Sequence, residues 1–225
     1  MMTVSTVVAV LAKGGLVMIP LAVCSVLSLA VILERAWFWL RVRSTGAAEH
    51  VLQLAAAGKW EDAVERAHAS PAPQARVLAA GLAHRDDGAT LAMEAAAREE
   101  MARMRRALPV LDTIVTLSPL LGLLGTVTGM IAAFGVISTS GINQPHAITG
   151  GVAEALIATA AGLGVAIVTL VPYNFFLARA ERTLDEIEGH GTRLELVLGV
   201  SSSMSRSATG SPGRDERRGD WGARG

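Results

Sequence analysis

The sequence predicts an all-α membrane protein with three transmembrane helices and a helical cytoplasmic domain between the first and the second. Two observations carry this prediction. Apolar residues make up 51% of the chain and charged residues only 18%. The charges are also segregated, because Gly14–Leu33, Thr113–Ala153 and Ala155–Ala178 contain no Asp, Glu, Lys or Arg. Uncharged apolar runs of this length can cross a bilayer as helices.

The first transmembrane helix is predicted at residues 14–40, after a periplasmic N-terminus at residues 1–13. The uncharged residues of this run supply about 30 Å of helix, which is one hydrocarbon thickness. An aromatic cluster, Trp37–Trp39, follows the run, and Arg41 and Arg43 come directly after it. This order of residues is typical of a helix that leaves the bilayer.

The uncharged run Thr113–Ala153 is too long for one crossing and predicts a helical hairpin. Ser138–Gly141 has the composition of a loop, and Pro145 suits the first turn of a helix that follows it. We therefore predict the second transmembrane helix at 110–137, a short periplasmic loop at 138–145 and the third transmembrane helix at 146–178.

The segment between the first two transmembrane helices, residues 41–109, is predicted to be a helical cytoplasmic domain. It is rich in alanine, and a break at Ser70–Pro73 separates two amphipathic regions. Good helix formers fill Thr90–Ala107, so we expect this helix to run on into the second transmembrane helix with at most a kink at Pro109. After the third transmembrane helix we expect a cytoplasmic helix at 179–200 and a disordered tail at 201–225.

The distribution of Lys and Arg predicts the orientation of the chain. The loop at 138–145 contains neither residue, whereas arginines flank both ends of the middle segment and follow the third transmembrane helix at Arg179 and Arg182. The positive-inside rule then places the middle segment and the C-terminus in the cytoplasm and the N-terminus in the periplasm.

Composition excludes several classes of function. The formal net charge is zero and there is no basic stripe with interleaved aromatic residues, which argues against a nucleic-acid partner. The single cysteine, Cys24, excludes a disulfide within the chain, and no Cys/His spacing suits a metal. We interpret Cys24 as a buried structural thiol. We expect no cofactor and no enzymatic activity, because Asp112 lies at the start of the second transmembrane helix, His146 lies beyond its other end, and no nucleophile–base pair is present.

Glu154 interrupts the apolar sequence between the second and third uncharged runs. A charged side chain inside a membrane costs several kcal/mol unless it is protonated, paired or facing a polar cavity, so a functional role is the default interpretation. The alternative is a carboxylate near the outer membrane boundary that is hydrogen-bonded to helix ends. Thr159 lies about 140° around the helix from Glu154 and about 7.5 Å along it. The two side chains therefore cannot share one narrow stripe.

Small residues mark a helix-packing face on each helix of the hairpin. Small residues at helical spacing let membrane helices approach closely, and we interpret them here as an interface at which several copies of the chain assemble. They are Gly122, Gly125 and Gly129 on the second transmembrane helix and Ala158 and Gly162 on the third.

Two motifs carry a resemblance to a known family. Ser118–Ile131, with the sequence SPLLGLLGTVTGMI, resembles the second membrane helix of ExbB and TolQ proteins, and Gly151–Leu163, GVAEALIATAAGL, resembles the third. The three-helix topology and the short outer loop also match this branch of the MotA/TolQ/ExbB proton channel family. The resemblance implies pore-lining threonines at Thr126 and Thr159 and a proton-pathway glutamate at Glu154.

The same resemblance implies the bacterial inner membrane as the location, and it implies the partners and the assembly. Five copies would form a ring around single-span partners of the ExbD or TolR type, and proton flow would drive movement that a TonB- or TolA-type protein relays to the outer membrane. The acid that carries the proton would belong to the partner. Two alternatives stay open: a flagellar-stator-like subunit of the MotA type, which usually has four transmembrane helices, and a passive membrane scaffold. An ExbB role and a TolQ role are not separated.

Overall fold

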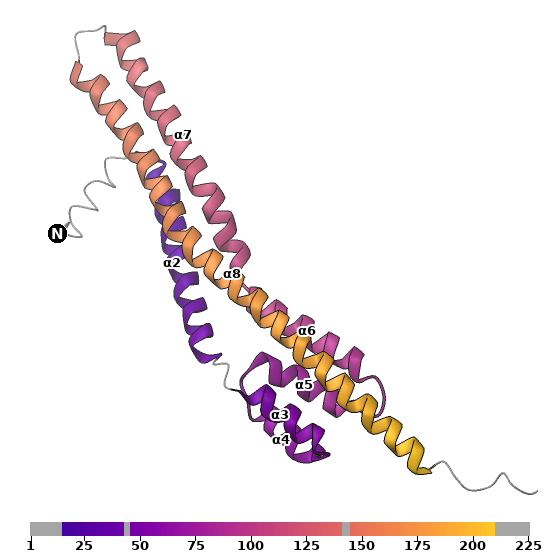
Figure 1. Cartoon of the computed structure of the whole chain (residues 1–225). Coiled ribbons are helices and arrows are strands. Elements are labelled where there is room, and N and C mark those ends of the chain that lie inside the picture. The colour runs from indigo at the N-terminus through magenta and orange to yellow at the C-terminus, as the bar shows by residue number, and fades with distance from the viewer. Residues whose placement is uncertain (1–14, 43–45, 141–144, 210–225) are drawn as a thin grey trace, which may run out of the picture. The chain divides into compact units, whose positions relative to one another are not determined.

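The computed structural model describes residues 15–42, 46–140 and 145–209, and every regular element in these ranges is a helix (Figure 1). The fold-class prediction of an all-helical chain is confirmed. So is the number of candidate membrane spans: three helical stretches are long and apolar enough to cross a membrane, Met18–Arg41, Ala89–Val136 and Thr149–Gly199. The helices are α2 (Met18–Arg41), α3 (Ala47–Ala56), α4 (Trp60–His68), α5 (Pro73–Ala83), α6 (Ala89–Arg105), α7 (Leu108–Ser140) and α8 (Pro145–Thr209).

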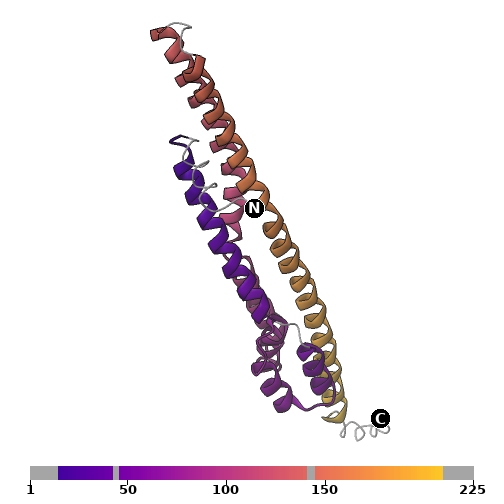
Figure 2. The same ribbon diagram turned by 90° about the vertical axis from the view of Figure 1, so that its left-hand side faces the viewer.

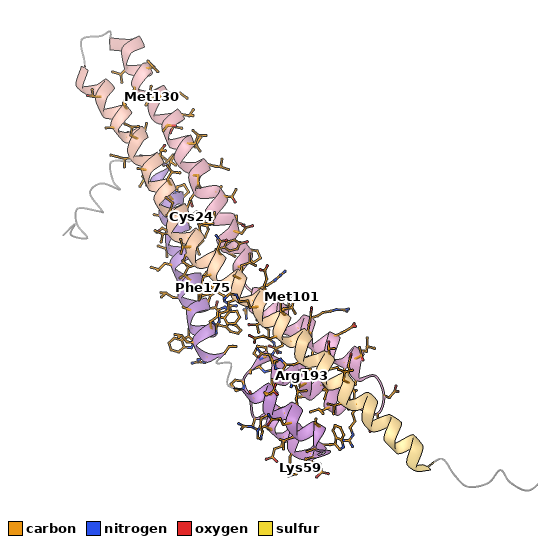
Figure 3. The ribbon with its side chains drawn as sticks, viewed as in Figure 1. Cys24, Lys59, Met101, Met130, Phe175 and Arg193 are labelled. Carbon is orange, nitrogen blue, oxygen red and sulfur yellow. The ribbon has the colours of Figure 1, made fainter. Side chains whose placement is uncertain are left out.

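The first of two structural units contains α2, α6 from Arg98 onward, α7, and α8 as far as Asp185. α7 and α8 form an antiparallel hairpin, and α2 lies beside it in both views (Figure 1, Figure 2). A small core forms where the beginning of α2 meets the hairpin, with Met18 and Leu21 buried against Ala158. Cys24 follows on α2 and is also buried, as we expected (Figure 3). The hairpin continues beyond the start of α2 (Figure 1, Figure 2).

α6 and α7 are separate helices, so the prediction of one continuous helix is wrong. α6 ends at Arg105, α7 begins at Leu108, and Ala107 between them has φ 64°. The left-handed conformation is costly for a residue with a side chain and marks a true break in the backbone. Pro109 then falls in the first turn of α7, where its missing N–H removes no helical hydrogen bond.

The ends of the hairpin differ in part from the expected loop. α7 continues to Ser140, and α8 begins at Pro145, which confirms the position of Pro145 in a first helical turn. α8 also runs to Thr209, into the segment that we expected to be disordered. The predicted N-terminus at 1–13, the middle of the predicted loop at 141–144 and the rest of the tail at 210–225 lie outside the described residues.

The second unit contains α3, α4, α5 and α6 as far as Ala97, together with α8 from Glu186. Alanines allow the short helices to pack closely, and Ala63, Ala67 and Ala75 are completely buried. Two polar contacts tie this unit to α8: Gln74 donates to the carboxylate of Glu186 at 2.5 Å, and the guanidinium of Arg193 (Figure 3) donates to both oxygens of Glu49 at 2.6 and 2.9 Å.

Candidate functional site

The predicted packing glycines of α7 lie against α8 of the same chain. A methyl group added at Gly162 would lie 2.5 Å from the carbonyl oxygen of Ser118, and one at Gly129 would lie 3.0 Å from that of Gly151. A methyl group at Gly125 would overlap the side chain of Ala158. Glycine is therefore required here because the two backbones approach closely. These residues form a helix contact within one chain. Our interpretation of them as an interface between several copies therefore has no support from their spacing alone.

Thr159 contacts α7 across this close approach. Its hydroxyl donates to the main-chain carbonyl of Gly122 at 2.9 Å. A carbonyl of a helix interior already accepts a helical N–H, and its second lone pair is available for this additional bond. Thr159 is half-buried, so part of its side chain stays accessible.

Thr126 donates to its own helix, to the carbonyl of Leu123 at 2.7 Å. Gly125 and Ala158, which contact each other, are the sequence neighbours of Thr126 and Thr159, so the two threonines lie at the same depth of the helix pair. Both hydroxyl hydrogens bond main-chain oxygens. The lone pairs of both hydroxyl oxygens therefore remain as acceptors.

Glu154 points to a different neighbour. Its side chain is half-buried, and its carboxylate lies over Gly15, directly before the first turn of α2. Thr126 on α7 and Thr159 on α8 thus both lie beside the contact between these two helices. The Glu154 side chain points instead toward the start of α2. This agrees with the expectation that Glu154 and Thr159 do not share one stripe.

Three buried hydroxyl groups in the first unit, those of Ser28, Thr169 and Ser118, were not proposed as site residues from the sequence. Ser28 of α2 and Thr169 of α8 are hydrogen-bonded at 2.7 Å, and Thr169 also donates to the carbonyl of Val165 at 2.7 Å. Ser118 is completely buried, and its hydroxyl has no hydrogen-bond partner within the described ranges. Serine and threonine are common in membrane helices, so their presence alone gave no signal.

Arg35 lies near the end of α2, where the sequence rule for positive charges predicts an exposed arginine. It is instead 2% exposed, and it donates to the main-chain carbonyls of Arg103 at 3.0 Å and Met104 at 3.5 Å. It also forms an ion pair with Glu34 and lies 4.8 Å from the centre of the Phe38 ring. The guanidinium therefore binds the last carbonyls of α6, where a helix favours a cation.

A metal-binding constellation is not found among the described residues, where no group of three or more His, Cys, Asp and Glu side chains could hold an ion. The polar groups of the site are hydroxyls, one carboxylate and main-chain carbonyls. The carboxylate can bind and release a proton, and the hydroxyls and carbonyls can hydrogen-bond a second carboxyl group.

Comparison with known proteins gives matches over most of the chain. The family model of the MotA/TolQ/ExbB proton channel family matches residues 69–189. The protein named biopolymer transport protein ExbB-like 1 of Synechocystis sp. is 39% identical over 193 residues, which cover 82% of this chain and 76% of the relative. Biopolymer transport protein exbB1 of Vibrio cholerae is 33% identical over 183 residues, 77% of this chain and 80% of the relative. The Tol-Pal system protein TolQ of Pseudomonas aeruginosa is 35% identical over 112 residues, 50% of this chain and 48% of the relative.

Proposed function

Because this chain belongs to the MotA/TolQ/ExbB proton channel family, in its ExbB/TolQ branch, we propose that it is the ring-forming subunit of a proton-driven motor in the bacterial inner membrane. Five copies would surround a single-span partner of the ExbD or TolR type. Proton flow between ring and partner would drive movement that a TonB- or TolA-type protein relays to the outer membrane. The N-terminus and the short loop would be periplasmic, and the middle domain and C-terminus cytoplasmic.

The geometry of Thr126 and Thr159 carries the proposal. Both hydroxyls donate to main-chain carbonyls and offer only lone pairs to another helix. A protonated carboxylic acid can donate to such a lone pair, whereas an ionised carboxylate can only accept. In this arrangement the threonines would stabilise the protonated acid of the partner. They would have to rotate and break their main-chain bonds before they could donate to the ionised form.

The surroundings of Thr126 leave room for a partner helix. Leu123 and Val127, on the same side of α7, are 59% and 49% exposed in the single chain. An apolar face of this size in the membrane is covered by lipid, by another copy or by a partner. A helix of the ExbD or TolR type at this face would bring its acid within reach of the hydroxyl of Thr126.

Glu154 lies where protons would enter the proposed proton path from the periplasmic side. It lies about two turns from the start of α8, and by the proposed orientation this end faces the periplasm. We propose that its carboxylate helps protons to enter. If Glu154→Gln retained full energy-dependent uptake or envelope integrity in cells, the charge would have no such role.

A passive scaffold is the second candidate, and one observation favours it. The carboxylate of Glu154 contacts the start of α2 in its own chain, as a purely structural helix-end contact would. Reconstitution into proteoliposomes with an imposed proton gradient separates the two functions. We expect proton flux from the chain with its single-span partner, and little flux when the partner's membrane acid is replaced by its amide. A scaffold would give no flux in either case.

Three relatives with ExbB names match 82%, 82% and 77% of this chain. Other ExbB-named relatives match 43%, 39% and 38%, and two TolQ relatives match 50% and 39%. We therefore propose that the partner is of the ExbD type and that the complex energises uptake through a TonB-type protein. Purification of the complex from native membranes should recover a TonB-type protein. Recovery of a TolA-type protein, or of flagellar components, would contradict this assignment.

A further inference from the structure

The contact between Glu154 and Gly15 is unusually close. A methyl group added at Gly15 would overlap Oε1 of Glu154, and it would lie 3.0 Å from Cδ and 3.4 Å from Cγ. The whole carboxyl group thus occupies the space that any side chain at position 15 would fill. Only glycine permits Glu154 to lie where it does.

Gly15 also sets the beginning of α2. Its φ is +72°, in the left-handed region that glycine adopts without steric cost. Its carbonyl accepts the N–H of Met18 at 3.1 Å, the first hydrogen bond of the turn that leads into α2. The first N–H groups of a helix have no acceptor within the helix and carry partial positive charge. The carboxylate therefore lies at the end of α2 that favours an anion.

The first turn of α2 reaches the other site residues too. Met18 packs against Ala158, the neighbour of Thr159. A methyl group at Gly125, the neighbour of Thr126, would lie 3.8 Å from Cβ of Val17. The conformation of Gly15 thus determines how one helical turn lies over the positions that flank Glu154, Thr126 and Thr159.

We propose that Gly15 is a positioning residue for the proton pathway: it provides the space in which the Glu154 carboxylate lies, directly before the first turn of α2. This inference rests on the proposed function for its consequence in proton flux, but the contact itself does not. A larger residue at position 15 would displace the carboxylate, the first turn of α2, or both.

The chain offers matched controls for the strain at Gly15. Gly58 and Gly88 have φ +73° and +80°, and a methyl group at either would meet nothing within 4 Å. Gly58→Ala and Gly88→Ala therefore introduce the same backbone strain without a steric overlap. Any additional effect of Gly15→Ala measures the contact with Glu154.

The first experiment is a double-mutant cycle on thermal unfolding of the purified complex. We expect Gly15→Ala to lower the melting temperature by about 2 °C more than Gly58→Ala, since the flexible Glu154 side chain must give up its place in addition to the backbone strain. In the Glu154→Ala background, where the overlapping group is absent, this excess should vanish. An equal excess in both backgrounds would overturn the proposal, whether or not the complex conducts protons.

The second experiment measures proton flux in proteoliposomes. Gly15→Ala should reduce flux by about tenfold, the effect of one misplaced hydrogen-bonding group, while Gly58→Ala and Gly88→Ala keep it. Glu154→Asp, which shortens the side chain by one methylene group, should restore part of the flux in the Gly15→Ala chain. A double variant that conducts no better than Gly15→Ala would contradict the positioning role. Absence of flux from the unmodified complex would instead contradict the proposed function, and the thermal cycle would still decide the role of Gly15.

Discussion

Replacing Arg35 with methionine should destabilise the protein more than any comparable change to an arginine at the end of α2. The Arg35 side chain is 3% exposed, and its guanidinium binds two carbonyls at the end of α6, those of Arg103 and Met104. Methionine fills much of the same volume but offers no donor. The substitution therefore removes one hydrogen-bond donor from each of two carbonyl oxygens, those of Arg103 and Met104, next to a buried side chain.

The magnitude follows from the two hydrogen bonds. A hydrogen bond to a charged group contributes about 1.5–3 kcal/mol, and the bond of 3.5 Å to Met104 adds little to this, so Arg35→Met should cost about 2–3 kcal/mol. Arg35→Lys keeps the charge but has no planar fork to reach both oxygens, and it should cost about half as much. The ion pair with Glu34 adds little, because the Glu34 side chain is 55% exposed.

Unfolding by a denaturing detergent in mixed micelles, followed by helical circular dichroism, measures these differences. The control is Arg41→Met, on the same helix, where the arginine is exposed and lies 4.9 Å from the centre of the Trp37 ring. That change should cost no more than about 1 kcal/mol. If Arg35→Met proved as stable as the Arg41 variant, the guanidinium of Arg35 would not stabilise the end of α6.

Three further predictions concern α8. Gly162→Ala should lower the melting temperature by several degrees, because the added methyl group would lie 2.5 Å from a carbonyl oxygen of α7. The control is Gly164→Ala, whose methyl group would enter open space and should change the melting temperature little. Equal shifts for the two variants would refute the close approach of α7 and α8. Thr159→Val should lose about 1 kcal/mol of stability that Thr159→Ser retains, and a valine variant as stable as the serine one would show that the bond to α7 contributes nothing. Arg193 lowers the pKa of Glu49 by hydrogen bonding and by its charge, so the stability from this pair is present above the usual pKa of 4.5 and is lost as pH falls through the lowered value. Glu49→Gln should therefore be less pH-sensitive on the acid side in thermal unfolding, and parallel profiles would contradict this.

The membrane-spanning helices could be predicted from the sequence because the burial of apolar side chains in lipid depends on runs of neighbouring residues. Uncharged runs long enough to cross a bilayer determine where membrane helices form, and Pro145 marked the beginning of α8 correctly. The break between α6 and α7 could not be predicted. The last carbonyls of α6 are bound by Arg35, a residue far away in the sequence. A rule about positive charges that flank a membrane does not distinguish an exposed arginine from a buried one.

The candidate site was predicted as a set of residues but not as a geometry. Motif and apolar context pointed to Thr126, Glu154 and Thr159. The sequence could not show which helix each side chain contacts, because this depends on how α2 is placed beside the hairpin. The small residues illustrate the difficulty: their spacing indicates a close helix contact equally well within a chain and between chains, and the structure places the contact within the chain. The ring therefore rests on the family.

The most direct test of a proton path along α7 and α8 is proton flux through the reconstituted complex with Thr126→Val and Thr159→Val together. Thr128→Val is the matched control, because Thr128 also donates to its own helix, at 3.0 Å to the carbonyl of Leu124, and is exposed. We expect the double variant to lose at least about tenfold in flux, since each valine removes one hydrogen-bonding group, and the control to conduct like the unmodified complex. Full flux from the double variant, in a complex that still assembles, would contradict the proposed role of these hydroxyls.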